Sequence, residues 1–495
     1  MKFGTAGLRG PMRDGLDAMN VPTVLRATWA VARVLTEQGH AGATVVVGRD
    51  ARHHSDEFAL ATAEVFNAQG FAVILLPRPL PTPVLAFAVR ALGAAAGVQI
   101  TASHNPATDN GYKLYLDGGI QIVPPTDRQI EDAMAVAPPP GAIAREPVPP
   151  GGEHLVDDYV ARAAGLRRGS GPLRIALTPL HGVGGELALR VLRDAGFTDV
   201  HTVATQFDPD PDFPTVVFPN PEEPGATDAL LALAADIDAD VAIALDPDAD
   251  RCAVGIPTAA GWRMLSGDET GWLLGDFLLS RLSAEEAGAA VVASSLVSSQ
   301  LLADIAARYG ARHVETLTGF KWLARADEQL PGATLLYAYE EAIGHCVDPA
   351  AVRDKDGISA ALVLADLVAG LTLRGSSVPE ALDELADRYG VDVTSAVSAR
   401  VDDAGAVMTR LRGAPPDRIA GIHVGVEDLA GRTDALIFTG PGLRVAVRPS
   451  GTEPKIKCYI EIRLAPGAPR ATAVALQRHV ETEMAALLNS PAPRP

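Results

Sequence analysis

The short segment Thr101-Ala102-Ser103-His104-Asn105-Pro106 places a hydroxyl beside an imidazole. It lies between an apolar run, residues 94–100, and a polar cluster, residues 108–111, that is typical of a turn. Open α/β sheets bind ligands at the carboxyl ends of buried strands, so this placement predicts that Ser103 is presented to a ligand. The alternative is a polar loop in which Ser103 only caps a turn.

A second segment carries three carboxylates, Asp246, Asp248 and Asp250, directly after the apolar run 241–245. Alternate side chains of an extended segment share one face, and three like charges packed together require a cation. Arg251 and Pro257 stand where an EF-hand needs Gly and Glu, and residues 246–250 include no Cys or His to favour Zn²⁺, so Mg²⁺ is the expected ion. The alternative is a solvated acidic turn.

A third segment, from Arg448 to Lys457, combines cations with Ser450, Gly451 and Thr452. A Gly lets backbone N–H groups approach closely and the cations neutralise charge, so the segment predicts a phosphate-binding loop. The alternative is a surface turn between two strands. Other cations lie mostly in polar or Gly-containing loops, which predicts a local anion site: Arg9, Arg49, Arg52, Lys113, Arg251 and Lys321.

One unit, in which β-branched runs alternate with helical segments, is repeated three times along the chain. The first pass ends at the Ser103 segment, the second at the aspartate segment and the third at the loop from Glu340 to His345. The expected strands are residues 44–47, 71–76, 94–100, 174–178, 199–203, 241–245, 290–293, 313–317 and 333–337. Thr82-Pro83 predicts a helix N-cap followed by Pro at the first helical position. The third strand of each pass runs into a loop rich in reactive side chains, and α/β sheets place such loops on one side of the fold.

The length of 495 residues predicts three or four domains, and the Pro/Gly-rich stretch 138–152 indicates the first boundary. The expected domains are residues 1–150, 151–258, 259–389 and 390–495. The last breaks the repeat, with alternating strands and one helix, and therefore predicts a smaller α+β domain. A disordered Pro-rich tail is expected from Ser490.

Composition argues against several partners. The net charge of −19 disfavours nucleic acid and anionic membranes. The start of the chain lacks the apolar core of a signal peptide, and the weakly charged run 288–303 is too polar to span a bilayer. Three widely spaced cysteines, Cys252, Cys346 and Cys458, indicate reduced thiols. A soluble cytoplasmic protein, monomeric or a small homo-oligomer, is expected.

Taken in order, the motifs resemble those of the α-D-phosphohexomutase superfamily, in its phosphoglucomutase and phosphopentomutase branch, over nearly the whole chain. The matching stretches are Phe3 to Gly10, Thr101 to Pro106, Asn110 to Lys113, Asp246 to Arg251, Thr318 to Lys321, Glu340 to Gly344, Asp354 to Gly357 and Ser450 to Pro454. The resemblance implies three related three-layer α/β/α domains with mixed sheets, a smaller C-terminal α+β domain and a central active-site cleft.

The resemblance also implies roles for individual residues. Ser103 would carry a phosphoryl group and share a Mg²⁺ ion with Asp246, Asp248 and Asp250. Arg9 and Lys113 would flank the transferring phosphate as charge stabilisers and acid/base candidates, and His104 is the rival phosphate carrier. The expected substrate-binding residues are Arg251, Thr318, Gly319, Lys321, Glu340, Glu341, His345, Arg448, Ser450, Gly451, Thr452 and Lys457.

One departure concerns the sugar. Many hexomutases have Gly-Glu-x-Ser in the sugar-binding loop, whereas this chain has Ala342 in place of the Ser, and an extra residue precedes His345. The Glu-Glu-Ala-Ile-Gly form favours glucose or ribose phosphates over mannose phosphate. The expected reaction converts glucose 1-phosphate to glucose 6-phosphate through a sugar bisphosphate, which also serves as primer. The alternatives are a phosphopentomutase, a phosphomannomutase, a metal-dependent phosphatase and a non-catalytic sugar-phosphate-binding protein.

Overall fold

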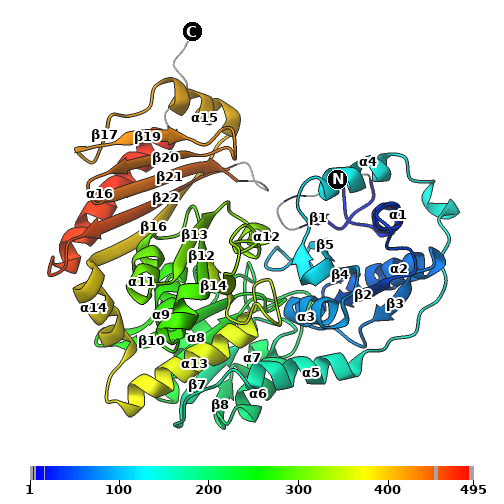
Figure 1. Ribbon diagram of the computed structural model, residues 1–495, viewed down its shortest axis with the longest axis horizontal. Coiled ribbons are helices and arrows are strands. Elements are labelled where there is room, and N and C mark those ends of the chain that lie inside the picture. Colours follow the sequence, from blue (N-terminus) through cyan, green and yellow to red (C-terminus); the bar gives the residue numbers. More distant parts are fainter. Residues whose placement is uncertain (1–3, 5–6, 16, 451–454, 490–495) are drawn as a thin grey trace.

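The computed structural model describes residues 4, 7–15, 17–450 and 455–489. Three α/β units and one C-terminal unit follow one another along the chain (Figure 1). The first, blue to cyan in Figure 1, contains β1 (Leu8–Pro11), α1 (Val21–Glu37), β2 (Thr44–Arg49), α2 (Ser55–Ala68), β3 (Ala72–Leu75), α3 (Thr82–Leu92), β4 (Ala96–Ile100), β5 (Asp109–Leu116), β6 (Ile120–Gln121) and α4 (Thr126–Ala135).

The second unit begins after the Pro/Gly-rich stretch. It contains α5 (Glu153–Ala164), β7 (Arg174–Thr178), α6 (Gly185–Asp194), β8 (Asp199–Thr202), α7 (Ala204–Phe207), α8 (Asp228–Asp236), β9 (Val241–Leu245), β10 (Cys252–Thr258) and β11 (Gly261–Met264).

The third unit, mostly green and yellow in Figure 1, contains α9 (Gly267–Leu279), α10 (Ala284–Ala289), β12 (Ala290–Ser295), α11 (Leu301–Tyr309), β13 (Arg312–Thr316), α12 (Phe320–Leu323), β14 (Thr334–Glu340), β15 (Gly344–Cys346), α13 (Gly357–Leu373) and α14 (Val378–Tyr389).

The fourth unit, orange to red, contains β16 (Val391–Arg400), α15 (Ala404–Gly413), β17 (Arg418–Ile419), β18 (Ile422–His423), β19 (Gly425–Asp428), β20 (Leu436–Gly440), β21 (Leu443–Pro449), β22 (Lys455–Leu464) and α16 (Arg470–Asn489). The expected tail from Ser490 lies outside the described residues.

The first three sheets share one topology. Their parallel strands run in the orders β3-β2-β4, β8-β7-β9 and β13-β12-β14, and a fourth strand, β5, β10 or β15, pairs antiparallel with the last of each. Every strand expected for the three repeats is present, and the mixed α/β fold is confirmed. The loop between the third and fourth strands therefore carries, in turn, Ser103, the three aspartates and Glu341.

The strand side chains explain why helices cover both faces of these sheets. In β2, Val45 and Val47 belong to the core under α1 and α2, whereas Val46 joins the core under α3. Continuous apolar runs of this kind are typical of strands buried on both faces. In the C-terminal unit the order is β16-β22-β21-β20-β19, and α16 packs on β16 and β22.

One apolar core runs through the first three units. It joins residues of β2 and α3 to α5, α6, α9 and α13, so these units share a hydrophobic interior. The C-terminal unit has its own core, and a small cluster that includes Leu296, Val297 and Ile437 connects it to the third unit. The first three units are thus joined by buried apolar surface far more extensively than the fourth.

Two expectations about local structure are wrong. The polar cluster 108–111 enters strand β5 at Asp109, because Asp109, Asn110 and Gly111 pair with Pro11, Gly10 and Arg9 of β1. Thr82 is the first residue of α3, with Pro81 at the cap position, and its hydroxyl instead donates to Asp248. Tertiary partners override the local turn and cap preferences at both places.

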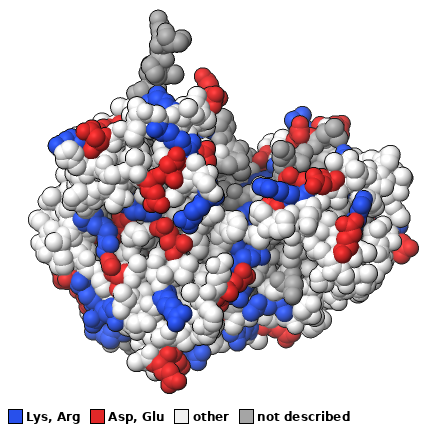
Figure 2. All heavy atoms as spheres, turned by 45° about the horizontal axis from the view of Figure 1, so that its top comes forward, with Lys and Arg blue, Asp and Glu red and all other residues white. Residues whose placement is uncertain are grey.

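The distribution of surface charge and the lengths of the apolar helices are relevant to binding of nucleic acids and membranes. Acidic and basic side chains are interspersed on the face shown in Figure 2. Among the described residues, no single helix is long and apolar enough to cross a membrane, although α13 and α14, bent by 90°, meet the length and composition criteria together. The three cysteines are buried and free.

Candidate active site

A cavity of about 450 Å³ lies where the four units meet. Twelve of the residues expected to be catalytic or substrate-binding line it: Arg9, Ser103, His104, Lys113, Arg251, Thr318, Gly319, Glu340, Glu341, Arg448, Ser450 and Lys457. Residues separated by more than 400 positions in the sequence therefore face one space. Further lining residues are Gly4, Gly7, Gln121, Asp250, Phe320, Ala342, Lys355 and Tyr459.

Ser103 is held in a left-handed backbone conformation, with φ of 53°, at the end of β4. Such a conformation is uncommon for a non-Gly residue and persists only where neighbouring contacts impose it. The Ser103 Oγ donates to Asp246 Oδ2 at 2.9 Å and lies 3.2 Å from His104 Nδ1. The hydroxyl is thus fixed between a carboxylate of the second unit and an imidazole.

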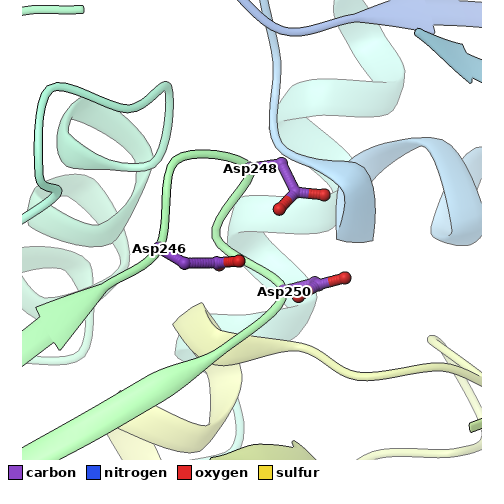
Figure 3. A group of neighbouring side chains, drawn as sticks. All are labelled: Asp246, Asp248 and Asp250. Carbon is purple, nitrogen blue, oxygen red and sulfur yellow. The ribbon is translucent and has the colours of Figure 1, made fainter. Parts of the chain in front are cut away.

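The three aspartates converge through a turn, so the expectation of an extended segment is wrong. Ala249 has a positive φ of 54°, and its N–H donates to the Asp246 carbonyl. One carboxylate oxygen from each aspartate lies within 4.8 Å of the others, and Figure 3 shows the three side chains on the loop that joins β9 to β10. Oδ1 of Asp248 and of Asp250 is buried without a hydrogen-bond partner in the described structure. Buried, all-oxygen donors with unused lone pairs fit a hard divalent cation such as Mg²⁺.

Two lysines form ion pairs with the same carboxylates, and a threonine donates a hydrogen bond to one of them. Lys113 Nζ lies 2.6 Å from Asp248 Oδ2 and 2.8 Å from Asp250 Oδ2, and Lys355 Nζ lies 3.2 Å from Asp250 Oδ2. The Thr82 hydroxyl donates to Asp248 Oδ2 at 2.5 Å. Groups from the first and third units therefore stabilise the charge of the aspartate loop.

Burial and neighbouring charges shift the pKa values of these groups in opposite directions. Burial and the two other carboxylates raise the pKa of Asp246. Burial alone would also raise the pKa of Asp250, but Lys113 and Lys355 lower it overall. For Lys113, burial acts to lower the pKa, but the two carboxylates outweigh it and the pKa is raised. Lys113 is therefore protonated at neutral pH and acts as a cation, which leaves it no lone pair with which to accept a proton.

His104 and Arg9 lie on the other side of Ser103. Burial, followed by Arg251 and Arg9, lowers the pKa of His104 well below its ordinary value, so the imidazole is neutral. Arg9 Nη1 donates to Asn105 Oδ1 at 3.0 Å, which fixes the guanidinium beside the loop. The neutral imidazole can accept a proton, whereas Arg9 can only stabilise negative charge.

The end of β14 and the loop that follows it present two carboxylates of different character. Glu340 Oε1 accepts from the Gly319 N–H at 2.7 Å, and the Thr318 hydroxyl is buried without a partner in the described structure. Glu341 accepts from Ser295 and Ser298, and burial, followed by the charge of Glu340, raises its pKa to about 7. Polar atoms of this loop are thus available to the hydroxyl groups of a ligand.

Two residues expected to bind substrate lie away from the cavity lining. His345 is fully buried on β15, where its Nδ1 hydrogen-bonds the Tyr337 hydroxyl at 2.9 Å and its ring stacks on Tyr337 and Tyr339. Burial lowers its pKa to about 3. Lys321 is half-buried on α12, and its ammonium lies 6.0 Å from the Trp322 ring centre. Strand alternation turns His345 inward, because neighbouring residues of a strand face opposite sides.

The C-terminal unit contributes the remaining cations. Arg448, Ser450 and Lys457 line the cavity from β21, its end and β22, whereas Gly451 and Thr452 lie outside the described residues. In the second unit, Arg251 also lines the cavity, and its Nη1 lies 3.4 Å from Glu222 Oε2. The Arg448 segment and Ser103 thus line one cavity from different units of the chain.

Three further residues that line the cavity, Lys355, Gln121 and Tyr459, were not predicted from the sequence to have a role. Gln121 and Tyr115 both donate to Asp354 at 2.7 Å, which anchors the segment that carries Lys355. The sequence Asp354-Lys355-Asp356-Gly357 could have indicated a functional role for Lys355, because it places a cation between two carboxylates beside a glycine. Gln121 and Tyr459 lie in ordinary strand sequences and gave none.

Four sequence-family models match the chain in order. They describe phosphoglucomutase/phosphomannomutase α/β/α domain I at residues 1–138, domain II at 157–259, domain III at 266–389 and the C-terminal domain at 376–468. The chain belongs to the phosphoglucomutase/phosphomannomutase family. The resemblance to the α-D-phosphohexomutase superfamily is thereby confirmed.

Individual family members are similar over most of their length. The "Probable phosphomannomutase" of Haemophilus influenzae is 43% identical, over 85% of this chain and 88% of its own. The phosphopentomutase of Mus musculus is 35% identical, over 94% and 84%. The crystal structure of a phosphoglucomutase/phosphomannomutase family protein of Burkholderia thailandensis has a TM-score of 0.76, with 22% identity over 99% and 98% of the two chains.

Membership of this family fixes the class of reaction. The chain is a phosphohexomutase-family isomerase, which is an intramolecular phosphotransferase. The family is metal-dependent, and the three aspartates form an acidic group that could bind the ion.

Proposed function

We propose that the protein interconverts the 1-phosphate and 6-phosphate of an aldohexose, with glucose 1-phosphate and glucose 6-phosphate as the pair. The observation that carries the proposal is the meeting of Ser103, the aspartate loop and six cations in one cavity of an acidic protein. Arg9, Lys113, Arg251, Lys355, Arg448 and Lys457 outnumber the three lining carboxylates, Asp250, Glu340 and Glu341, so the cavity favours dianionic ligands.

Ser103 is the proposed phosphate carrier. In the first transfer, a sugar hydroxyl oxygen forms a bond to phosphorus while the bond from phosphorus to Ser103 Oγ breaks, which leaves a sugar bisphosphate. In the second transfer, Ser103 Oγ attacks the other phosphate and the sugar oxygen leaves. Phosphoryl transfer depends mainly on positioning and charge neutralisation.

Proton transfer is assigned to the neutral imidazole of His104. Its Nδ1 lies 3.2 Å from Ser103 Oγ and the imidazole is neutral, so it can accept the proton of the attacking hydroxyl and give a proton to the departing oxygen. Lys113 and Arg9 stabilise the charge on the transferring group. Asp246, Asp248 and Asp250 would hold Mg²⁺, which supplies charge neutralisation at the phosphoryl oxygens when bound.

The cavity has a second anion site for the phosphate that is not being transferred. Arg448, Ser450 and Lys457 supply it from the C-terminal unit. A bisphosphate that turns around exchanges its two phosphates between Ser103 and this site. The looser attachment of the C-terminal unit supports opening and closing during that exchange.

A phosphopentomutase is the second candidate. Ala342 lines the cavity where many hexomutases have a Ser, so one hydrogen bond to a hexose hydroxyl is missing, and the mouse relative is a phosphopentomutase. Side-by-side rates with the 1-phosphates of glucose, mannose and ribose, primed by the matching bisphosphate, would decide. A ribose rate above the glucose rate would replace the proposed substrate.

The carrier role is tested by labelling with a sugar bisphosphate radioactive in one phosphate. Wild-type protein should retain acid-stable label on the peptide that contains Ser103, and Ser103→Ala should retain none and lose at least about 10³-fold in turnover. Ser450→Ala, which changes a hydroxyl in the same cavity, should still be labelled. Acid-labile label would assign the phosphate to His104 instead, and near-normal turnover of Ser103→Ala would refute the proposal.

A further inference from the structure

Arg52 lies beneath the Ser103 loop and is 4% exposed. It follows β2 in the segment 50–54 and does not line the cavity. Its guanidinium donates to four backbone carbonyls of the loop. Nη2 donates to Ser103 O and Asn105 O at 2.6 Å each, and Nη1 donates to Pro106 O at 2.8 Å and Asp109 O at 3.2 Å.

These contacts account for the conformation of the loop. With φ of 53°, Ser103 turns its carbonyl toward the interior, where Arg52 Nη2 receives it, and its side chain toward Asp246. A planar fork with five N–H donors can hold several carbonyls in a fixed arrangement, which an ammonium on a flexible stem cannot. The direction of Ser103 Oγ therefore depends on a side chain that does not touch it.

Arg52 is itself held from two sides. Its Nε lies 3.3 Å from Asp50 Oδ2, and Asp50 Oδ1 accepts from the Ser55 hydroxyl at 2.6 Å. From the second unit, the ring of Phe213 lies against the guanidinium, 4.9 Å from its Cζ. Burial acts to lower the pKa of Arg52, and the carboxylate of Asp50 opposes that shift. The cation is thus immobilised between two units.

We propose that Arg52 is a positioning residue for phosphoryl transfer. It holds the carbonyls of the Ser103 loop so that Oγ faces the aspartate loop and the cavity. The inference rests on the proposed function, but its structural part, the ordering of residues 101–110, can be tested separately.

The chain offers a matched control in Arg167. This arginine also donates to two backbone carbonyls, Ala195 O and Gly171 O, and also lies against a phenylalanine ring, that of Phe197. It lies away from the cavity. A loss of general stability caused by removing a carbonyl-bound guanidinium would appear in both variants, whereas a loss of positioning would appear only at Arg52.

The test compares Arg52→Lys with Arg167→Lys. Arg52→Lys should lower kcat about 100-fold while KM changes less than about threefold, because misplacement of a reacting group by about 1 Å has such an effect on rate. Amide hydrogen exchange should accelerate in residues 101–110. Arg167→Lys should leave kcat, KM and that exchange as in the wild type.

A second variant separates the guanidinium from general destabilisation. Arg52→Ala should be slower still, and added methylguanidinium should restore part of its kcat. If Arg52→Ala does not fold, the Lys variant alone decides the matter. A kcat of Arg52→Lys within twofold of wild type, or an equal loss in both Lys variants, would overturn the inference. If wild-type protein has no mutase activity, the proposed function fails, and the hydrogen exchange still tests the ordering of the loop.

Discussion

Glu341 shows how one side chain can make stability depend on pH. Burial and the neighbouring Glu340 raise its pKa to about 7, so the protonated carboxyl is the form that the fold favours. A pKa raised on folding contributes stability that is complete below the unfolded value of about 4.5 and is lost as the pH rises through 7. Glu341→Gln keeps the neutral form at every pH.

We therefore expect Glu341→Gln to gain stability relative to the wild type as the pH rises from 5 to 8. The gain should be on the order of 2 kcal/mol in the free energy of unfolding. Urea unfolding at several pH values measures it. The exposed Glu328→Gln is the control and should show no such trend, and a constant difference for Glu341→Gln would contradict the prediction.

The three converging aspartates predict linkage between metal and stability. Magnesium added to EDTA-treated protein should restore turnover and raise Tm. At a magnesium concentration 100 times Kd, the free energy of unfolding should increase by about 3 kcal/mol. Asp246→Asn should abolish the rise in Tm. Differential scanning fluorimetry provides a readout that does not depend on activity. Full turnover after exhaustive chelation would remove the ion from the mechanism.

A second set of three alternating aspartates serves as the control for this experiment. It also shows that alternating spacing alone does not predict a metal site. Asp208, Asp210 and Asp212 repeat the alternating pattern, yet they lie in an exposed loop, and the triad at Asp246 is the one acidic group of the described residues whose ligand atoms converge. The Asp246 group differs from the Asp208 group because it follows the buried strand β9 and contains the turn at Ala249. Asp212→Asn should leave the magnesium effect unchanged.

At the scale of elements, the start of α13 supports the aspartate loop. The Gly357 N–H donates to the Ala249 carbonyl at 3.1 Å, and an added Cβ would lie 2.4 Å from the Arg251 carbonyl oxygen. Asp356 caps the helix by accepting from Ile358 and Ser359. The loop and the helix terminus therefore pack backbone to backbone.

Gly357→Ala should displace this loop. We expect a loss of about 1–3 kcal/mol of stability and a weaker response to magnesium, because overpacking against backbone cannot relax through side-chain rotation. Gly370→Ala in the same helix, where a Cβ meets only the end of Arg374 at 3.5 Å, should be neutral or stabilising by up to about 1 kcal/mol. Calorimetry of both variants checks the difference, and equal effects would show that helix propensity alone is responsible.

Periodicity predicted the repeated strands because they are buried runs of β-branched and small residues. It did not predict β5, which begins with Asp, Asn and Gly and forms because β1 and β4 flank it. Thr82 was interpreted as a cap, but its hydroxyl binds Asp248, 166 residues away. Local sequence predicts local preference, and such long-range partners decide where the two disagree.

At the scale of the molecule, a buried carboxyl pair joins the third and fourth units. Ser299 Oγ lies 2.8 Å from Glu461 Oε1 and 3.1 Å from Asp392 Oδ2, and it accepts from the Leu301 N–H. A hydroxyl has one proton to donate, so both contacts are hydrogen bonds at the same time only when one of the two carboxyls is protonated. Burial, followed by Glu461, raises the pKa of Asp392 accordingly.

This junction should weaken at high pH, because a raised pKa means that stability is lost as the proton leaves. The charges facing the pair are Asp268, Arg463 and, beyond Arg463, Asp304. We expect the radius of gyration measured by small-angle scattering to increase as the pH is raised from acidic to alkaline values. Glu461→Gln, whose amide donates without titrating, should suppress the change, and an unchanged radius in the wild type would contradict the prediction.

The pairing of Lys113 with Asp248 and Asp250 also constrains the order in which a growing chain can complete its fold. Lys113 belongs to β5 of the first unit, and the two carboxylates that pair with its ammonium follow 135 and 137 residues later. While the ribosome has released only the first unit, this lysine has neither partner, and an unpaired buried charge opposes packing. We therefore expect the surroundings of this ammonium to close only after the aspartate loop has been synthesised.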